Sequence, residues 1–151
     1  MADGWLSKYN RYSASAAIKR GKAMLNSGIP YVWGGKTPSG FDCSGFVCYC
    51  YGISAGGTAN FQNALPGYGF KNATGTKMQE GDIVFWVQGE GGHEYGHTGI
   101  YLRTGQVMQS EGGIGPHIGS CYGAFANHIF RPPEGAGFYP IHWDGYDEIK
   151  K

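Results

Sequence analysis

The stretch that most constrains how this chain folds is residues 31–51, where a glycine-rich loop turns abruptly into an apolar run. The apolar run begins at Asp42-Cys43-Ser44. Aspartate is a preferred N-cap residue, because its carboxylate accepts hydrogen bonds from the free backbone N–H groups of the first helical turn. We therefore expect Cys43 in the first turn of a helix, beside the positive end of the helix dipole. A thiol in that setting is biased toward the reactive thiolate, so a cysteine nucleophile is the first hypothesis.

The composition is that of one globular domain and excludes several classes of partner. The chain has 151 residues, of which 41% are hydrophobic, and this is enough for a single core. Its formal net charge of +1 argues against nucleic acid and against a membrane surface as partners. No run of roughly 18 apolar residues occurs, so no membrane span is expected. The first residues also lack the basic segment and apolar stretch of a signal peptide.

The four cysteines are not spaced for disulfide bonds. Cys43 and Cys48 lie on one expected helix, Cys48 and Cys50 point to different sides of it, and the fourth is Cys121. We expect reduced thiols, with Cys48 and Cys50 buried as apolar side chains in the helix packing.

Helical patterns come first along the chain. Residues 13–27 carry small and apolar side chains at a spacing of three to four, and Gly28 and Pro30 are stop signals. The apolar run predicts a second helix over residues 43–51, and a shorter helix is expected around residues 58–65. The N-terminal half is therefore expected to be mainly helical.

After Gly81 the pattern changes to short apolar runs that are typical of strands. We predict a buried strand over residues 82–87, a loop over 88–96, a hairpin of 97–102 with 106–110, and short strands at 114–118 and 128–131. Helices followed by strands that are joined by hairpins indicate the α+β class, with N-terminal helices packed on an antiparallel sheet.

A cysteine nucleophile needs a base, and His97 is the best placed histidine because it opens a strand directly after a glycine-rich loop. If residues 103–105 form a three-residue hairpin loop, His97 pairs with Glu111 and shares one face with Gln109 and Glu111. A two-residue turn would put His97 and Gln109 on opposite faces. Either Gln109 or Glu111 could then orient the imidazole, and the sequence does not choose between them.

The other histidines, His93, His117, His128 and His142, are expected to be structural or exposed. His93 and His97 have a spacing that two zinc ligands can adopt, but the further ligands of a zinc site are missing from the pattern. We therefore expect no metal ion and no other cofactor.

Four motifs follow one another between residues 29 and 110: P-Y-V-W-G-G, F-D-C-S-G-F-V, G-D-I-V-F-W and H-T-G-I-Y-L. Together they resemble the NlpC-type cell-wall cysteine peptidases, which are papain-like enzymes that cleave peptide bonds in bacterial peptidoglycan. The resemblance implies a papain-like catalytic domain over residues 1–131. Residues 132–151 are rich in Pro, Gly, acids and aromatics, and are interpreted as a tail or the start of a linker.

Carried over by position, the resemblance makes Cys43 the nucleophile, His97 the general base and Gln109 the residue that orients the imidazole. Gln109 can accept an N–H bond, but it has no charge to stabilise an imidazolium. Tyr31 matches a tyrosine whose hydroxyl lies near the oxyanion site. The remaining candidates for oxyanion or substrate binding are Trp33 in the cleft loop and the two residues that flank the nucleophile, Asp42 and Ser44.

The implied function is cleavage of the peptidoglycan stem peptide, commonly between D-glutamate and the diamino acid. The loop over residues 88–96 is longer than is usual for the family and is reminiscent of phage-type amidases. The first alternative is therefore an amidase that opens the bond between muramic acid and L-alanine. The second is a silent module that binds the cell wall or builds a virion. The missing signal peptide suggests a phage endolysin made in the host cytoplasm, or equally a trimmed secreted enzyme, and no oligomeric state is predicted.

Overall fold

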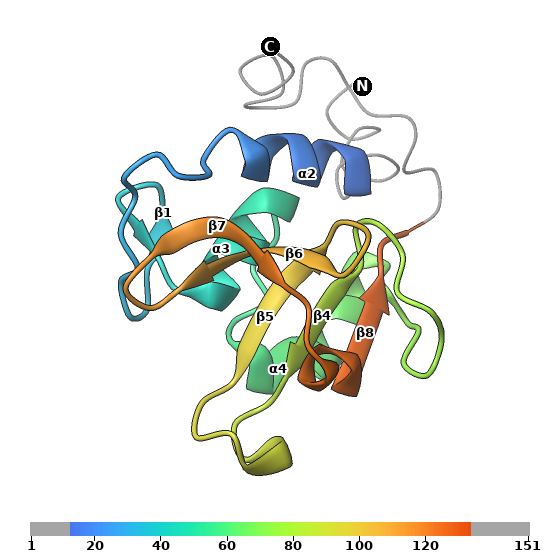
Figure 1. Cartoon of the computed structure of the whole chain (residues 1–151). Coiled ribbons are helices and arrows are strands. Elements are labelled where there is room, and N and C mark those ends of the chain that lie inside the picture. The colour runs from blue at the N-terminus through green and yellow to red at the C-terminus, as the bar shows by residue number, and fades with distance from the viewer. Residues whose placement is uncertain (1–12, 134–151) are drawn as a thin grey trace.

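The computed structural model describes residues 13–133 as helices packed against one six-stranded antiparallel sheet (Figure 1). The helices are α2 (Ala14–Lys22), α3 (Cys43–Tyr51) and α4 (Thr58–Ala64), with 3₁₀ turns η1 (Leu65–Tyr68), η2 (Glu90–Gly92) and η3 (Gly123–Asn127). The strands are β1 (Lys36–Thr37), β2 (Gly40–Phe41), β3 (Lys71–Asn72), β4 (Ile83–Trp86), β5 (His97–Tyr101), β6 (Gln106–Glu111), β7 (Gly115–Ser120) and β8 (His128–Arg131). The predicted α+β class is confirmed.

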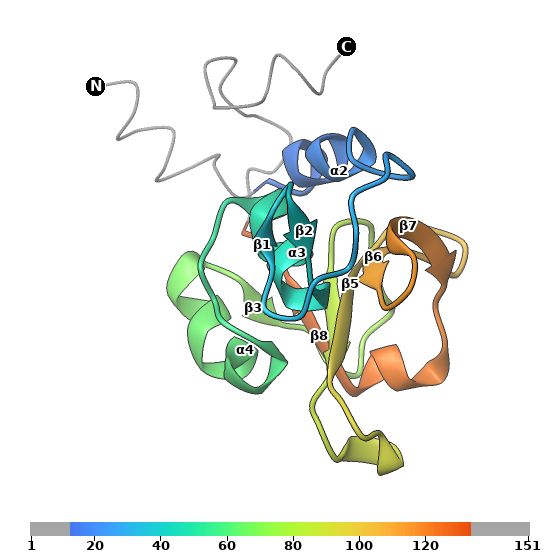
Figure 2. The ribbon, with the colours of Figure 1, turned by 90° about the vertical axis from the view of Figure 1, so that its left-hand side faces the viewer.

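The strand order of the main sheet is β3-β8-β4-β5-β6-β7, and a separate two-stranded sheet joins β1 and β2. Helix α3 contacts α2 on one side and β5 and β6 on the other, so it lies between the first helix and the middle of the sheet (Figure 2). The core cluster joins these layers, because it contains buried residues of all three. The N-terminus of α3 is thereby held next to the start of β5.

Helix α2 is shorter than the predicted 13–27. Ser13 caps it, because its hydroxyl accepts a hydrogen bond from the Ala16 N–H at 3.2 Å. After Lys22 the chain leaves the helix and turns through Asn26, which has a φ of 52°. The Asn26 N–H bonds the Pro116 carbonyl on β7 at 3.1 Å. This tertiary bond anchors a segment that local spacing alone would extend as a helix.

Helix α3 begins and ends where the sequence predicts. The Asp42 carboxylate accepts a hydrogen bond from the Gly45 N–H at 2.6 Å, and Gly52 ends the helix in a left-handed conformation with a φ of 73°. A Cβ on Gly45 would lie 2.0 Å from the carbonyl oxygen of Gly35. The helix can therefore approach the preceding loop this closely only because residue 45 has no side chain. That loop contains β1 and β2, a small hairpin that the sequence pattern did not predict.

The hairpin between β5 and β6 has the register expected of a three-residue loop, with Ile100 opposite Met108 and Tyr101 opposite Val107. The turn itself has positive φ at both Thr104 and Gly105, whereas the prediction placed only Gly105 there. The Leu102 N–H bonds the Gln106 carbonyl, whereas the Gln106 N–H bonds the Arg103 carbonyl. Leu102 and Arg103 therefore both stand opposite Gln106, and Arg103 is the extra residue of a β-bulge. The register therefore keeps alternate residues of the two strands on a common face.

The remaining strand predictions are confirmed at β4, β7 and β8, and β3 is an additional short edge strand. None of the helices within residues 13–133 is long and apolar enough to span a membrane. The predicted tail over residues 132–151 lies almost wholly outside the described residues, so the domain limits remain a prediction.

Candidate active site

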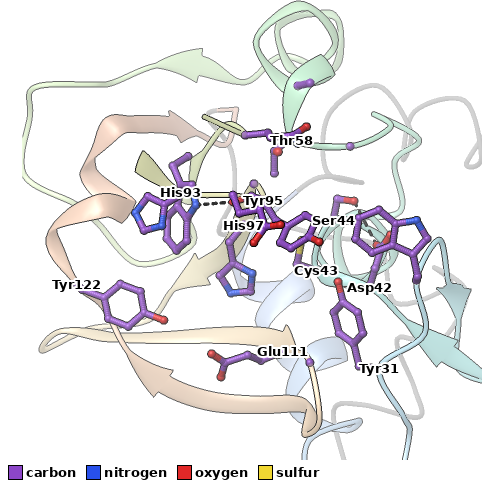
Figure 3. Close-up of a pocket in the computed structure, with 18 residues that line it drawn as sticks. Tyr31, Asp42, Cys43, Ser44, Thr58, His93, Tyr95, His97, Glu111 and Tyr122 are labelled. Carbon is purple, nitrogen blue, oxygen red and sulfur yellow. Dashed lines mark hydrogen bonds between the residues drawn. The ribbon is translucent and has the colours of Figure 1, made fainter. Parts of the chain in front are cut away.

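A cleft of about 840 Å³ opens at the N-terminus of α3 (Figure 3). Both Cys43 and His97 line it, although they lie far apart in the sequence. The wall around them comes from the loop before α3, the start of α4, the loop before β5, and the segments after β6 and β7. Of the predicted site residues, Tyr31, Trp33, Asp42 and Ser44 also line the cleft. Gln109 is not among the residues that line the cleft, and it is only 2% exposed.

Cys43 is the first residue of α3, and its side chain is 8% exposed. Burial, and next the charge of Asp42, raise the pKa of the Cys43 thiol to about 11, while the backbone N–H groups of Ser44 and Thr98 act in the opposite direction. The expectation that its place at the helix N-terminus biases this thiol toward thiolate is therefore wrong. The same carboxylate that caps the helix opposes a negative charge on the sulfur.

His97 is the first residue of β5 and stands opposite Trp86 on β4. Its ring packs against Trp86 and Phe125, with ring centroids 5.3 Å and 5.7 Å apart. The residue before it, Gly96, packs tightly, because a Cβ there would lie 2.1 Å from Oγ1 of Thr58. The chain therefore packs against the start of α4 just before β5, and this packing fixes the position of the His97 backbone.

The Nε2 atom of His97 lies 2.6 Å from the Oε1 atom of Gln109. An amide oxygen can only accept, so this bond places the proton on Nε2 and leaves Nδ1 as the nitrogen that is free to take up a proton. Of the two residues that the sequence left open, Gln109 makes the hydrogen bond. Glu111 instead lies 3.1 Å from Nε2 of His117 on the neighbouring strand. Burial lowers the pKa of His97, although Gln109 and then Glu111 partly oppose this effect.

The hydroxyl of Tyr31 points toward Cys43 (Figure 3). Burial, followed by the charges of Cys43 and Asp42, raises the pKa of the phenol to about 12, and a hydrogen bond involving the Cys43 backbone partly offsets this. Tyr31 therefore keeps its proton at neutral pH and remains a hydrogen-bond donor. Its backbone is tied to Phe41 by an isolated bridge, which fixes the loop beside the nucleophile.

Asp42 has a structural role beyond its place in the cleft. Besides capping the helix, its carboxylate accepts hydrogen bonds from the Ser44 hydroxyl at 3.2 Å and the Gly34 N–H at 3.1 Å. Trp33, which the sequence analysis placed in the cleft loop, is 77% exposed. It meets Tyr95 edge to face, with ring centroids 5.9 Å apart. Both rings line the cleft and are open to a ligand.

The sequence did not single out several residues that line the cleft. Tyr95 comes from the long loop over residues 88–96, and Tyr122 from the segment before η3. His93, which was expected to be a solvated loop residue, also lines the cleft and stacks on Trp86 with ring centroids 4.4 Å apart. No short-range pattern marks these positions, because the fold brings them together from separate loops.

Two other histidines pair with carboxylates, in agreement with the structural roles expected of them. His117 pairs with Glu111, and His128 lies 2.8 Å from Oε2 of Glu90. His142 lies outside the described residues. Residues 13–133 contain no group of three or more His, Cys, Asp or Glu side chains that could hold a metal ion.

Cys48 and Cys50 of α3 behave as predicted. All four cysteines of the chain are free thiols, and Cys48 and Cys50 are 8% and 0% exposed. Burial raises the pKa of the Cys48 thiol to about 11 and that of Cys50 further. These two side chains therefore contribute to the core as small apolar groups.

Comparison with known proteins identifies relatives among cell-wall enzymes. The model of the NlpC/P60 family matches residues 28–130. The probable endopeptidase p60 of Listeria grayi is 35% identical over 102 residues, which are 66% of this chain and 19% of p60. Murein DD-endopeptidase MepH of Escherichia coli (strain K12) is 35% identical over 121 residues, 72% of this chain and 42% of MepH. The chain thus spans less than half the length of either relative.

Solved structures with the same fold include the NlpC/p60 domain of the peptidoglycan hydrolase SagA, with a TM-score of 0.59 and 33% identity. That match covers 78% of this chain and 97% of the SagA domain. RipD of Mycobacterium tuberculosis, a non-catalytic NlpC/p60 domain protein adapted to peptidoglycan binding, has a TM-score of 0.58 and 20% identity, over 78% of this chain and 95% of that chain. The second likeness shows the fold alone. With a family model matched over most of its length and a papain-like α+β fold, this chain belongs to the NlpC/P60 family.

Proposed function

We propose that this chain is a peptidoglycan hydrolase, a cysteine endopeptidase that cleaves the stem peptide. Cys43 would be the nucleophile, His97 the general base and Gln109 the residue that orients it. One observation carries the proposal: Cys43 and His97 line one cleft, and the Nε2 atom of His97 is held 2.6 Å from a buried amide oxygen. This arrangement leaves the other ring nitrogen available for the thiol proton. The endopeptidase and hydrolase names of the relatives support the same reaction class.

The first step is transfer of the Cys43 proton to Nδ1 of His97. A thiol with a pKa of about 11 is ionised in only about one molecule in ten thousand at neutral pH, so the helix dipole alone cannot supply the nucleophile. The burial that lowers the pKa of His97 also keeps the imidazole neutral and ready to accept this proton. The thiolate therefore forms when substrate and base are both in place.

The thiolate attacks the carbonyl carbon of the scissile amide, and the carbonyl oxygen becomes an oxyanion. The backbone N–H of Cys43 and the hydroxyl of Tyr31 are the donors proposed to stabilise it. Tyr31 suits this role because its raised pKa keeps the phenol protonated. A single donor of this kind typically lowers the barrier by about 3 kcal/mol.

The imidazolium of His97 then gives its proton to the leaving amine, the C–N bond breaks, and a thioester remains on Cys43. A water molecule loses a proton to His97 and attacks the thioester. The acyl group leaves as a carboxylic acid, and the proton on His97 returns to the sulfur. Each step uses the same imidazole as base and then as acid, so a fixed ring orientation is needed throughout.

For the scissile bond we propose the amide between D-glutamate and the diamino acid. The alternative is the amide between muramic acid and L-alanine, because the long loop over residues 88–96 contributes His93 and Tyr95 to the cleft. A catalytically silent wall-binding module is the third possibility, since the fold also occurs in a non-catalytic protein. The proposed origin of the chain in a phage endolysin remains a prediction from the sequence.

Digestion of purified cell walls under reducing conditions, followed by mass spectrometry of the products, distinguishes these functions. We expect a new amine on the diamino acid and a new carboxyl group on D-glutamate, with no release by the Cys43→Ala variant. A new amine on L-alanine would replace the endopeptidase with an amidase. Cleavage of the cross-link after D-alanine would overturn the choice of bond. Binding to walls without any release would establish the silent module.

A further inference from the structure

The proposed base is held by a neutral residue, although it must carry a positive charge during the reaction. Gln109 offers His97 an amide dipole but no negative charge. A nearby carboxylate stabilises an imidazolium more strongly than an amide does. Asp42, which also lines the cleft, already caps α3 and bonds Ser44 and Gly34. The other carboxylates that line the cleft are Glu94 and Glu111.

Glu111 is placed to supply this charge. Continuing the register of β5 and β6 from Ile100 and Met108 puts Glu111 opposite His97, where Cβ atoms are typically about 5 Å apart. Glu111 and His97 both line the cleft, and Figure 3 shows them on the same side of it. The side chain of Glu111 is 38% exposed, so its charge is partly screened by water but not removed from the site.

His117 holds the carboxylate of Glu111 from the next strand. It stands opposite Gln109 in the pairing of β6 with β7. Its Nδ1 atom lies 3.0 Å from the carbonyl oxygen of Gly115, so Nδ1 carries a proton in order to donate to that oxygen. The Nε2 atom, 3.1 Å from Oε1 of Glu111, can donate to the carboxylate only when it is protonated as well. The contact with Glu111 is thus an ion pair when His117 is an imidazolium.

We propose that Glu111 stabilises the protonated form of His97 in place of a charged third residue, and that His117 controls this effect by taking up a proton and pairing with Glu111. Both are positioning residues that act through His97. When His117 is neutral, the full charge of Glu111 acts on His97. When His117 is protonated, its charge cancels that of Glu111. The inference rests on His97 as the proposed base, but its test does not require activity.

The effects of Glu111 and His117 on the pKa of His97 have the opposite directions that the proposal requires. Glu111 raises the pKa of His97 and His117 lowers it, while burial is the largest influence and also lowers it. The other titratable groups that line the cleft with His97 come from three places: Tyr31, Asp42 and Cys43 at and before the start of α3, His93, Glu94 and Tyr95 in the loop before β5, and Tyr122 before η3. Burial, and next the charge of Glu111, raise the pKa of Tyr122, so this carboxylate also acts on a second side chain that lines the cleft.

The consequence is a base that remains available in acid. A proton on His117 withdraws the support of Glu111 from the imidazolium of His97. His97 then holds its proton less tightly and stays neutral to a lower pH than it would beside an uncompensated carboxylate. When His117 is neutral, the Glu111 carboxylate is no longer paired with a positive charge. It then favours the imidazolium of His97 that forms when Cys43 gives up its proton.

The experiment is an NMR titration of the His97 imidazole in the Cys43→Ala background, which removes the thiol as a coupled group. We expect Glu111→Gln to lower the pKa of His97 and His117→Gln to raise it. With Glu111→Gln already present, adding His117→Gln should raise the pKa of His97 by less than it does in the wild type, because His117 then lacks the carboxylate that favours its charged form and keeps only its direct effect on His97. Shifts of the same sign in both single variants, or no shift in either, would overturn the proposal.

Glu90→Gln is a matched control, because Glu90 forms the other histidine–carboxylate pair, with His128, and its side chain is 37% exposed. This variant should leave the pKa of His97 unchanged. In the active enzyme, the acidic limb of the kcat/KM profile should move to lower pH in Glu111→Gln and to higher pH in His117→Gln. A protein that cleaves no peptidoglycan but shows the NMR shifts would refute the proposed function and leave this inference standing.

Discussion

The Nε2 atom of His97 lies 2.6 Å from the Oε1 atom of Gln109, and the amide that makes this bond is only 2% exposed. The bond joins two neighbouring strands, so the orientation of the imidazole depends on the register of one hairpin. Ser110 fixes the same strand to the loop before α3, because its hydroxyl donates to the Phe41 carbonyl at 3.1 Å. The position of the proposed base is therefore coupled to that of the proposed nucleophile through the sheet.

Replacing Gln109 tests whether orientation of the imidazole matters. Gln109→Leu keeps the volume but removes the acceptor, so we expect kcat to fall by about tenfold or more, the worth of one buried hydrogen bond. Gln109→Glu keeps an acceptor, adds a charge and should retain most of the activity. Steady-state kinetics on a defined muropeptide measures both. Equal activity of the wild type and Gln109→Leu would contradict an orienting role.

Tyr31→Phe removes the proposed oxyanion donor and leaves the ring in place. We expect kcat to fall by about 100-fold with little change in KM, because the hydroxyl acts in the transition state more than in the ground state. Tyr95→Phe is the control, since it removes another phenol hydroxyl from the same cleft and keeps the ring that contacts Trp33. A comparable loss in both variants would indicate a general effect on the cleft.

The state of the Cys43 thiol can be followed through the ultraviolet absorbance of the thiolate. Folding raises the pKa of this thiol, so the protonated form is favoured below about pH 11. The difference spectrum between the wild type and Cys43→Ala should show no thiolate at neutral pH, and thiolate should appear only as the pH approaches 11. A thiolate signal already present at neutral pH would demonstrate a resting ion pair with His97.

Gly119 on β7 faces the amide of Gln109, and a Cβ there would lie 2.3 Å from its Nε2 atom. Gly119→Ala should push the amide aside and misorient His97, lowering kcat by about 10- to 100-fold. The thermal midpoint of unfolding should change little. Gly67→Ala in η1 is the matched control, because a Cβ at that residue also meets no atom within 4 Å and Gly67 does not line the cleft. A normal kcat in Gly119→Ala would show that the amide tolerates displacement.

The sequence predicted the elements that depend on local chemistry. Helix α3 was placed correctly because Asp42 is a strong cap and Gly52 a strong stop. Strand β4 was predicted from its continuous apolar run, and all of its residues are buried. Strands β1, β2 and β3 were missed because each has only two residues, too few for a periodic pattern.

Whether Gln109 or Glu111 orients the imidazole of His97 could be decided only from the three-dimensional structure. Both side chains lie on the face shared with His97, and only the position of His117 on β7 shows that Glu111 has another partner. The ionisation of Cys43 was also predicted wrongly, because the capping pattern shows the helix N-terminus but not the burial of the thiol, which raises its pKa. Local capping geometry gave the position of the thiol but not its environment.

The most direct test of the central claim compares Cys43→Ala with Cys48→Ala. Both residues are buried cysteines of α3 with the same 8% exposure, but only Cys43 lines the cleft with His97. Initial rates of stem-peptide cleavage should fall to background in Cys43→Ala, while Cys48→Ala should retain activity in the fraction that folds. Cleavage at the wild-type rate by Cys43→Ala would contradict the proposed mechanism.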